Sequence, residues 1–80
     1  MKTKEKKELD LPKWFNGTVY KAGAEVTNPY SGCSAVLNNK ELSMYDLILG
    51  CERFGHYDIM RKGLDWFRRS NGDAYMILLD

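Results

Sequence analysis

The spacing of hydrophobic residues changes once along the chain and divides it into two parts. Between residues 9 and 37, apolar residues come in short β-branched or aromatic runs separated by Asn, Gly and Pro. This pattern predicts three short strands, at 18–20, 25–27 and 34–37, joined in a small antiparallel meander. So small a sheet is not stable alone, so we expect a helix to cover one of its faces.

From residue 39 onward the apolar positions recur with helical spacing. Asn38 is a good N-cap, and Glu41 follows it three residues later in a capping-box arrangement. Gly55 is a natural C-cap, so a helix is predicted over 39–54. Its polar residues fill an arc of only about 80°. The helix is therefore predicted either to be central in the fold or to lend an apolar face to a partner.

A second helix is predicted over 58–70, with Asp58 as its N-cap. It is amphipathic, and its apolar face lies opposite a basic face that also carries Asp65. The last segment, 73–79, could be a helix capped by Asp73 or a strand, and its Ala, Met and Leu content favours a helix.

These elements together predict the α+β class, with a small antiparallel β-meander followed by two or three helices packed on it. With only 80 residues, the chain has room for one domain, which we place at 9–80. Residues 1–8 are rich in lysine and poor in core-forming residues, so they are predicted to be a disordered basic arm.

Charge and composition narrow the function classes. The net charge of +1 gives no overall field that would attract nucleic acid or an anionic membrane. No apolar run approaches the roughly 20 residues of a membrane span. The charged N-terminus does not resemble a secretion signal, so we expect a cytoplasmic protein with reduced cysteines.

The sequence contains no recognisable catalytic or metal-binding constellation. It has one histidine, and Cys33 and Cys51 do not form a C-x-x-C pair, so no metal is expected. Cys51 and His56 have poor spacing for a nucleophilic pair, and no glycine-rich phosphate loop is present. We therefore predict a protein that is not an enzyme and needs no cofactor.

The leading functional prediction is a non-catalytic module that binds another protein or a second copy of itself. The first helix offers more apolar surface than one small sheet and one helix would cover. An exposed tyrosine in the Asn28–Gly32 loop is a fair recognition element. The candidate contact residues are Tyr30, Met44, Leu47 and Cys51.

The alternative is an accessory protein that binds nucleic acid through the N-terminal arm and the basic face of the second helix. Arginine and lysine on such a face can contact phosphates, although charged solvent-facing surfaces are common on amphipathic helices. The candidate contact residues are Lys13, Trp14, Arg61, Lys62, Arg68 and Arg69.

A set of short strings lies in a recognisable order along the chain: Trp14–Tyr20, Gly23, Val26–Gly32, Glu41–Asp46, Gly63–Phe67, Ala74–Met76 and Leu78–Asp80. Together they resemble a family of short proteins of unknown activity from tailed phages of marine and cyanobacterial hosts. The resemblance covers about residues 11–80, and the segment around His56 is shorter here than in the family. It implies a role in the cytoplasm of an infected bacterium or in the phage particle, and it supplies no catalytic residues.

Overall fold

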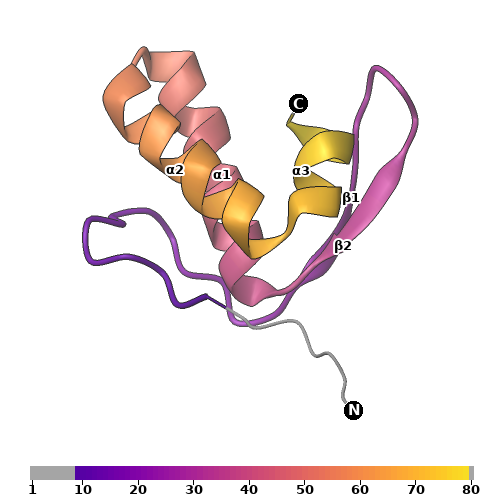
Figure 1. Ribbon diagram of the computed structural model, residues 1–80, viewed down its shortest axis with the longest axis horizontal. Coiled ribbons are helices and arrows are strands. Elements are labelled where there is room, and N and C mark those ends of the chain that lie inside the picture. The colour runs from indigo at the N-terminus through magenta and orange to yellow at the C-terminus, as the bar shows by residue number, and fades with distance from the viewer. Residues whose placement is uncertain (1–8, 80) are drawn as a thin grey trace.

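The computed structural model describes residues 9–79 and confirms the α+β class (Figure 1). A hairpin of two strands is followed by three helices. The predicted basic arm, 1–8, lies outside the described residues. The elements are β1 (Ala24–Thr27), β2 (Ser34–Leu37), α1 (Asn39–Phe54), α2 (Tyr57–Ser70) and α3 (Gly72–Leu78).

β1 and β2 pair in antiparallel fashion, with Ala24 opposite Leu37 and Thr27 opposite Ser34. The loop between them closes with a backbone hydrogen bond from the Asn28 N–H to the Cys33 carbonyl, at 2.8 Å. Two of the predicted strands therefore form.

The predicted strand at 18–20 is wrong. The N–H of Tyr20 donates to Ser43 Oγ at 2.9 Å, and its carbonyl accepts from Asn39 Nδ2 at 3.3 Å. Side chains of α1 thus satisfy the backbone groups that a strand neighbour would have paired. This tertiary pairing overrides the β-favouring composition of the segment.

The ends of α1 agree with the sequence. The Asn38 side chain accepts from the Glu41 N–H at 2.8 Å, and the Glu41 carboxylate accepts from the Asn38 N–H at 3.0 Å. This is the predicted capping box. Gly55 ends the helix in the left-handed region, at a φ of 79°, and its N–H donates to the Cys51 carbonyl.

The predicted caps of the other two helices are wrong. α2 begins at Tyr57 after His56, and Asp58 lies within its first turn. α3 forms as the favoured helix, but Asn71 caps it by accepting from the Ala74 N–H at 3.2 Å, and Asp73 again lies in the first turn. The chain turns at Asn71 directly from α2 into α3, so this residue ends one helix and caps the next.

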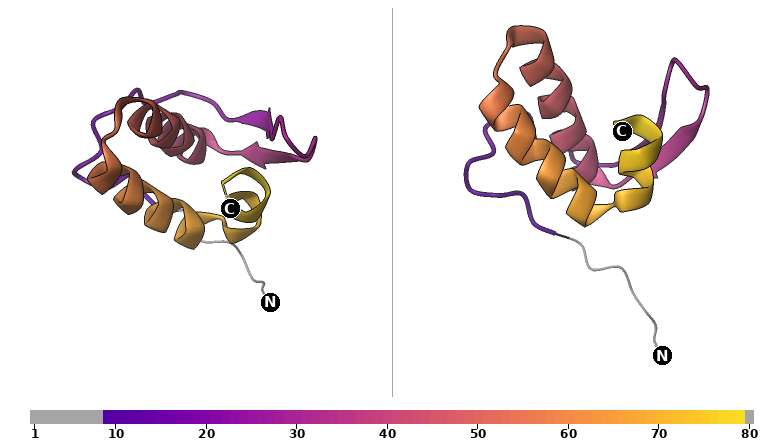
Figure 2. Two further views of the ribbon diagram at one scale, coloured as in Figure 1. Left: turned by 90° about the horizontal axis from the view of Figure 1, so that it is seen from above. Right: turned by 45° about the horizontal axis from the view of Figure 1, so that its top comes forward.

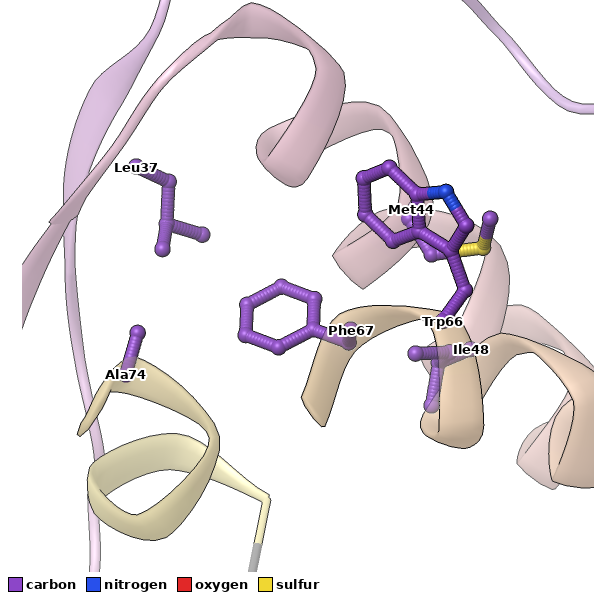
Figure 3. Packing of buried hydrophobic residues seen from close by; sticks show 6 residues of the cluster. All are labelled: Leu37, Met44, Ile48, Trp66, Phe67 and Ala74. Carbon is purple, nitrogen blue, oxygen red and sulfur yellow. The ribbon is translucent and has the colours of Figure 1, made fainter. Parts of the chain in front are cut away.

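The core lies where the two long helices meet the hairpin and α3 (Figure 3). Phe67 is fully buried and lies between Leu37 and Ala74 on one side and Met44 and Ile48 on the other. α1 and α2 approach closely at Gly63, where an added Cβ would lie only 2.9 Å from Ile48 Cγ1.

The coil before β1 is packed against the helices. The indole N–H of Trp66 donates to the Asp10 carbonyl at 3.0 Å, which ties the start of the described chain to α2. At the other end of the coil, a Cβ on Gly23 would lie 1.9 Å from the Leu37 carbonyl oxygen, so only glycine fits there. Leu11, Trp14 and Phe15 pack against the core from this coil.

The elements spread from a common base. α1 and α2 run side by side, and the hairpin and α3 lie across from them, so that the two groups diverge toward the hairpin tip (Figures 1 and 2). None of the helices described between residues 9 and 79 has the length and apolar character needed to cross a bilayer.

A candidate docking groove

An open groove of about 470 Å³ lies between the two diverging groups of elements. One wall comes from α1 and α2, and the other from the hairpin tip and the end of α3. The lining is mainly aliphatic, which is the composition expected of a surface that excludes water on binding. Its aliphatic residues are Ile48, Leu49, Met60, Leu64, Leu78 and Leu79.

Tyr30 stands at the rim of the groove and is 97% exposed. Asn28 fixes the loop that carries it. The Asn28 side-chain oxygen accepts from the Tyr30 N–H at 2.8 Å, and its Nδ2 donates to the Ile77 carbonyl at 2.9 Å. The hairpin tip is thereby tied to α3, and the aromatic ring is held at the mouth of the groove with almost no contacts of its own.

The polar groups of the lining are few and do not include a basic side chain. Glu52 is the one ionisable carboxylate of the lining and is exposed. Tyr45 lies deeper, with its ring centroid 6.5 Å from that of Phe67. Burial raises the pKa of the Tyr45 phenol above its ordinary value, so it stays neutral at physiological pH. The groove therefore combines aliphatic side chains with polar surface, and its lining carries one negative charge.

Glu41 holds the base from which both walls rise, and it is only 4% exposed. Its Oε1 accepts from the Asn38 N–H at 3.0 Å and from Asn71 Nδ2 at 3.2 Å. Its Oε2 accepts from Ser70 Oγ at 3.4 Å. One buried carboxylate thus links the start of α1 to the junction of α2 and α3. The capping pattern was visible in the sequence, but this contact across about thirty residues was not.

Two of the four predicted partner contacts are corrected by the structure. Met44 and Cys51 are buried within the chain and are not available on a free surface. Met44 packs where α1 crosses α2 at Gly63. The expectation of uncovered surface on this part of α1 failed because the second helix and the N-terminal coil cover it.

Leu47 and Cys51 border a second, smaller hollow of about 320 Å³ beneath the N-terminal coil. Leu47 is half-buried there. Burial raises the pKa of the Cys51 thiol, which makes it a poor nucleophile. His56 also borders this hollow, and the hydrogen bond between the two residues is a backbone one, from the His56 N–H to the Cys51 carbonyl at 2.9 Å. Of the predicted partner contacts, only Tyr30 lies on the larger groove.

The predicted basic residues lie elsewhere, on the outer face of α2. Arg68 and Arg69 each pair with Asp65, with nitrogen–oxygen distances of 3.1 Å, so one carboxylate offsets one of their two positive charges. Lys62 Nζ lies 5.9 Å from the centre of the Trp14 ring, a cation–π contact. The neighbouring Lys13 and Arg61 are exposed.

Within residues 9–79, no group of three or more His, Cys, Asp or Glu side chains comes together in a way that could hold a metal ion. Comparison with known proteins yields no matching family model, no matching curated protein and no matching solved structure.

Proposed function

We propose that the protein is a non-catalytic interaction module whose groove binds an apolar, helical segment of another protein. The observation that carries this proposal is the aliphatic groove between α1–α2 and the α3–hairpin wall, with Tyr30 exposed at its rim. A solvent-facing aromatic side chain beside an apolar concave surface is typical of protein interfaces.

The shape of the groove favours a helix over a small molecule. A groove that opens between two walls can receive one face of a helix, which with its side chains is about 10–12 Å across. Such a ligand would insert anchors spaced at i, i+3 or i+4, and i+7 between the aliphatic walls. A site for a small molecule would instead enclose its ligand and present several convergent polar groups.

The charge of the groove selects the chemistry of the partner. Glu52 is negative, and the lining offers no basic side chain to balance it. An amphipathic helix with a lysine or arginine beside its apolar face would pair with this carboxylate and would be steered toward the groove. A partner helix with an acidic flank would be disfavoured for the same reason.

The resemblance to short phage proteins gives this proposal its biological setting. In that setting the module acts in the cytoplasm of the infected host, and its partner is a bacterial or phage protein. The partner supplies any catalysis.

Selecting binders from a displayed library of random helical peptides would test whether the groove binds a helix. We expect enriched peptides with apolar residues in helical spacing and a positive flank. Leu49→Gln should weaken the best peptide by about tenfold or more, because it places a polar amide on the groove wall. Met76→Gln is the matched control, since both residues are exposed helical aliphatic side chains, at 38% and 67%, and only Leu49 lines the groove.

Affinity measured by isothermal titration and chemical-shift mapping by NMR would give the outcome. The groove is not the docking site if the selected peptides bind Leu49→Gln as tightly as the unaltered chain. The same follows if the chemical-shift changes that the peptides cause in the protein map to the outer face of α2. Equal thermal stability of the two variants would show that the fold is intact in both.

One arrangement favours a second candidate function, nucleic-acid binding. Lys62 from α2 lies over the Trp14 ring, and Lys13 precedes Trp14 in the chain, so these residues could contact phosphate and a base. Lys62→Ala should then reduce the affinity for labelled single-stranded DNA and flatten its salt dependence. If the protein does not bind labelled single-stranded DNA even at low salt, this candidate function is removed.

A further inference from the structure

The hairpin carries an open edge on β1. Within the described chain, α1 and α3 pack against β2, whereas the substantial packing contact of β1 is with β2. Seen from above, β2 lies between β1 and α3, so β1 is the outermost strand (Figure 2, left). Three of the four β1 residues are exposed, and only Val26 is partly covered.

The hydrogen-bond pattern shows which backbone groups point outward. The bond from the Asn28 N–H to the Cys33 carbonyl makes this pair a hydrogen-bonded one. Pairs alternate along an antiparallel ladder. Val26 and Ala24 are therefore bonded to β2, while the N–H and C=O of Glu25 and Thr27 point away from it. No described residue pairs with these outward groups.

We propose that β1 pairs with β1 of a second copy of this chain, so that the two hairpins form one four-stranded antiparallel sheet. The two-fold axis passes between the two Val26 residues. Glu25 of each copy then lies opposite Thr27 of the other, and the outward N–H and C=O groups of both residues are all satisfied.

This register is self-complementary in charge and shape. The carboxylate of Glu25 lies opposite a hydroxyl and not opposite its own copy, so no like charges face each other directly. The two Val26 side chains meet on the face of the sheet that bears the core. β1 contains no proline and no lysine, two residues with which natural edge strands block such pairing, and Glu25 is its one charged residue.

A second copy is favoured over an unrelated strand because one two-fold axis satisfies both edges at once. The contact is short, well below the roughly 1,600 Å² of a standard interface. We therefore expect a reversible dimer that forms at high micromolar concentration.

Sedimentation equilibrium on the full chain, from about 10 µM to about 1 mM, would measure this dimer. Glu25→Pro removes one outward N–H from each copy and leaves the bonds to β2 in place, because a proline at an outward-facing edge position is tolerated. We expect it to weaken dimerisation by about tenfold or more. Glu25→Ala keeps the N–H and should dimerise within about threefold of the unaltered chain.

Cross-linking would test the register independently. Val26→Cys, made together with Cys33→Ser, should form an intermolecular disulfide under mild oxidation with copper phenanthroline, because the two Val26 positions face each other across the axis. Ala24→Cys in the same background places the thiols far apart and should remain monomeric on a non-reducing gel.

The proposal is overturned if the chain is monomeric throughout this concentration range. It is equally overturned if Glu25→Pro, shown to be folded by circular dichroism, dimerises as well as Glu25→Ala. Preferential cross-linking through Ala24→Cys would also contradict it.

Discussion

Replacing Gly63 by alanine tests how closely the two long helices pack. Gly63 is buried in the middle of α2, and its missing side chain lets α2 approach α1. A Cβ there would lie 2.9 Å from Ile48 Cγ1 and 3.2 Å from Met44 Sδ. The first distance is shorter than van der Waals contact, and Ile48 is a stiff, β-branched side chain within a closed core.

Two opposing contributions set the size of the effect. Alanine is a better helix former than glycine by about 1 kcal/mol. Overpacking a closed core costs about 1–3 kcal/mol. The net change for Gly63→Ala is therefore expected to lie between about 0 and 2 kcal/mol of lost stability.

Gly50 provides the matched control on α1. It also lies in a helix interior, but an added Cβ would meet nothing within 4 Å. Gly50→Ala should therefore stabilise the protein by about 0.5–1 kcal/mol. The difference between the two variants isolates the cost of the close approach, about 1–3 kcal/mol.

Urea denaturation followed by tryptophan fluorescence would measure both free energies of unfolding, since the buried Trp66 reports on the core. Equal stabilisation by Gly63→Ala and Gly50→Ala would refute the close packing of α1 and α2. A loss of stability in Gly50→Ala would instead contradict the open space around Gly50.

Three other predictions concern the buried Glu41 carboxylate, the two thiols and a surface ion pair. Glu41→Ala should cost about 2–4 kcal/mol in urea denaturation, because it leaves a backbone N–H and two side-chain donors without their acceptor; a loss under about 0.5 kcal/mol would contradict the network. In native buffer, a thiol reagent such as DTNB should modify the exposed Cys33 quickly and Cys51 only after unfolding, since Cys51 is buried and burial raises its pKa. Modification of both cysteines at the same rate in the folded protein would contradict this. The hydrogen bond and positive charge of Lys40 lower the pKa of Asp10, so its stabilising contribution is present above the unfolded-state pKa and is lost as pH falls through the lower folded-state pKa. The melting-temperature deficit of Asp10→Asn should therefore be seen at neutral pH and shrink below about pH 4, and a deficit that grows in acid would contradict it.

Features that depend on neighbours within about four residues could be predicted from the sequence. The capping box of α1 and its glycine C-cap are both local, and both are confirmed. The amphipathic pattern of α2 is equally local, and its apolar side does contribute Trp66 and Phe67 to the core. The caps of α2 and α3 were missed because an aspartate near a helix start can lie at the cap or one turn inside.

Features that depend on distant partners could not be predicted. Residues 18–20 have strand composition, but their backbone partners turned out to be side chains of α1. The apolar arc of α1 was visible, yet its periodicity does not say how much of it the N-terminal coil covers. Met44 and Cys51 were therefore placed on a docking surface when they are buried. The groove itself arises from the divergence of elements, which no local pattern encodes.

The position of Glu41 couples the shape of the groove to the stability of the fold. Asn38 lies where β2 passes into α1, and Asn71 lies where α2 passes into α3, so the Glu41 carboxylate binds both junctions at the base of the diverging walls. A small shift at this base would become a larger displacement at the mouth, where the hairpin tip and the end of α3 lie (Figure 1). We therefore expect this buried carboxylate, which does not line the groove, to influence the width of the groove. If the groove is the docking site, a substitution at Glu41 should weaken docking even though the partner never touches that residue.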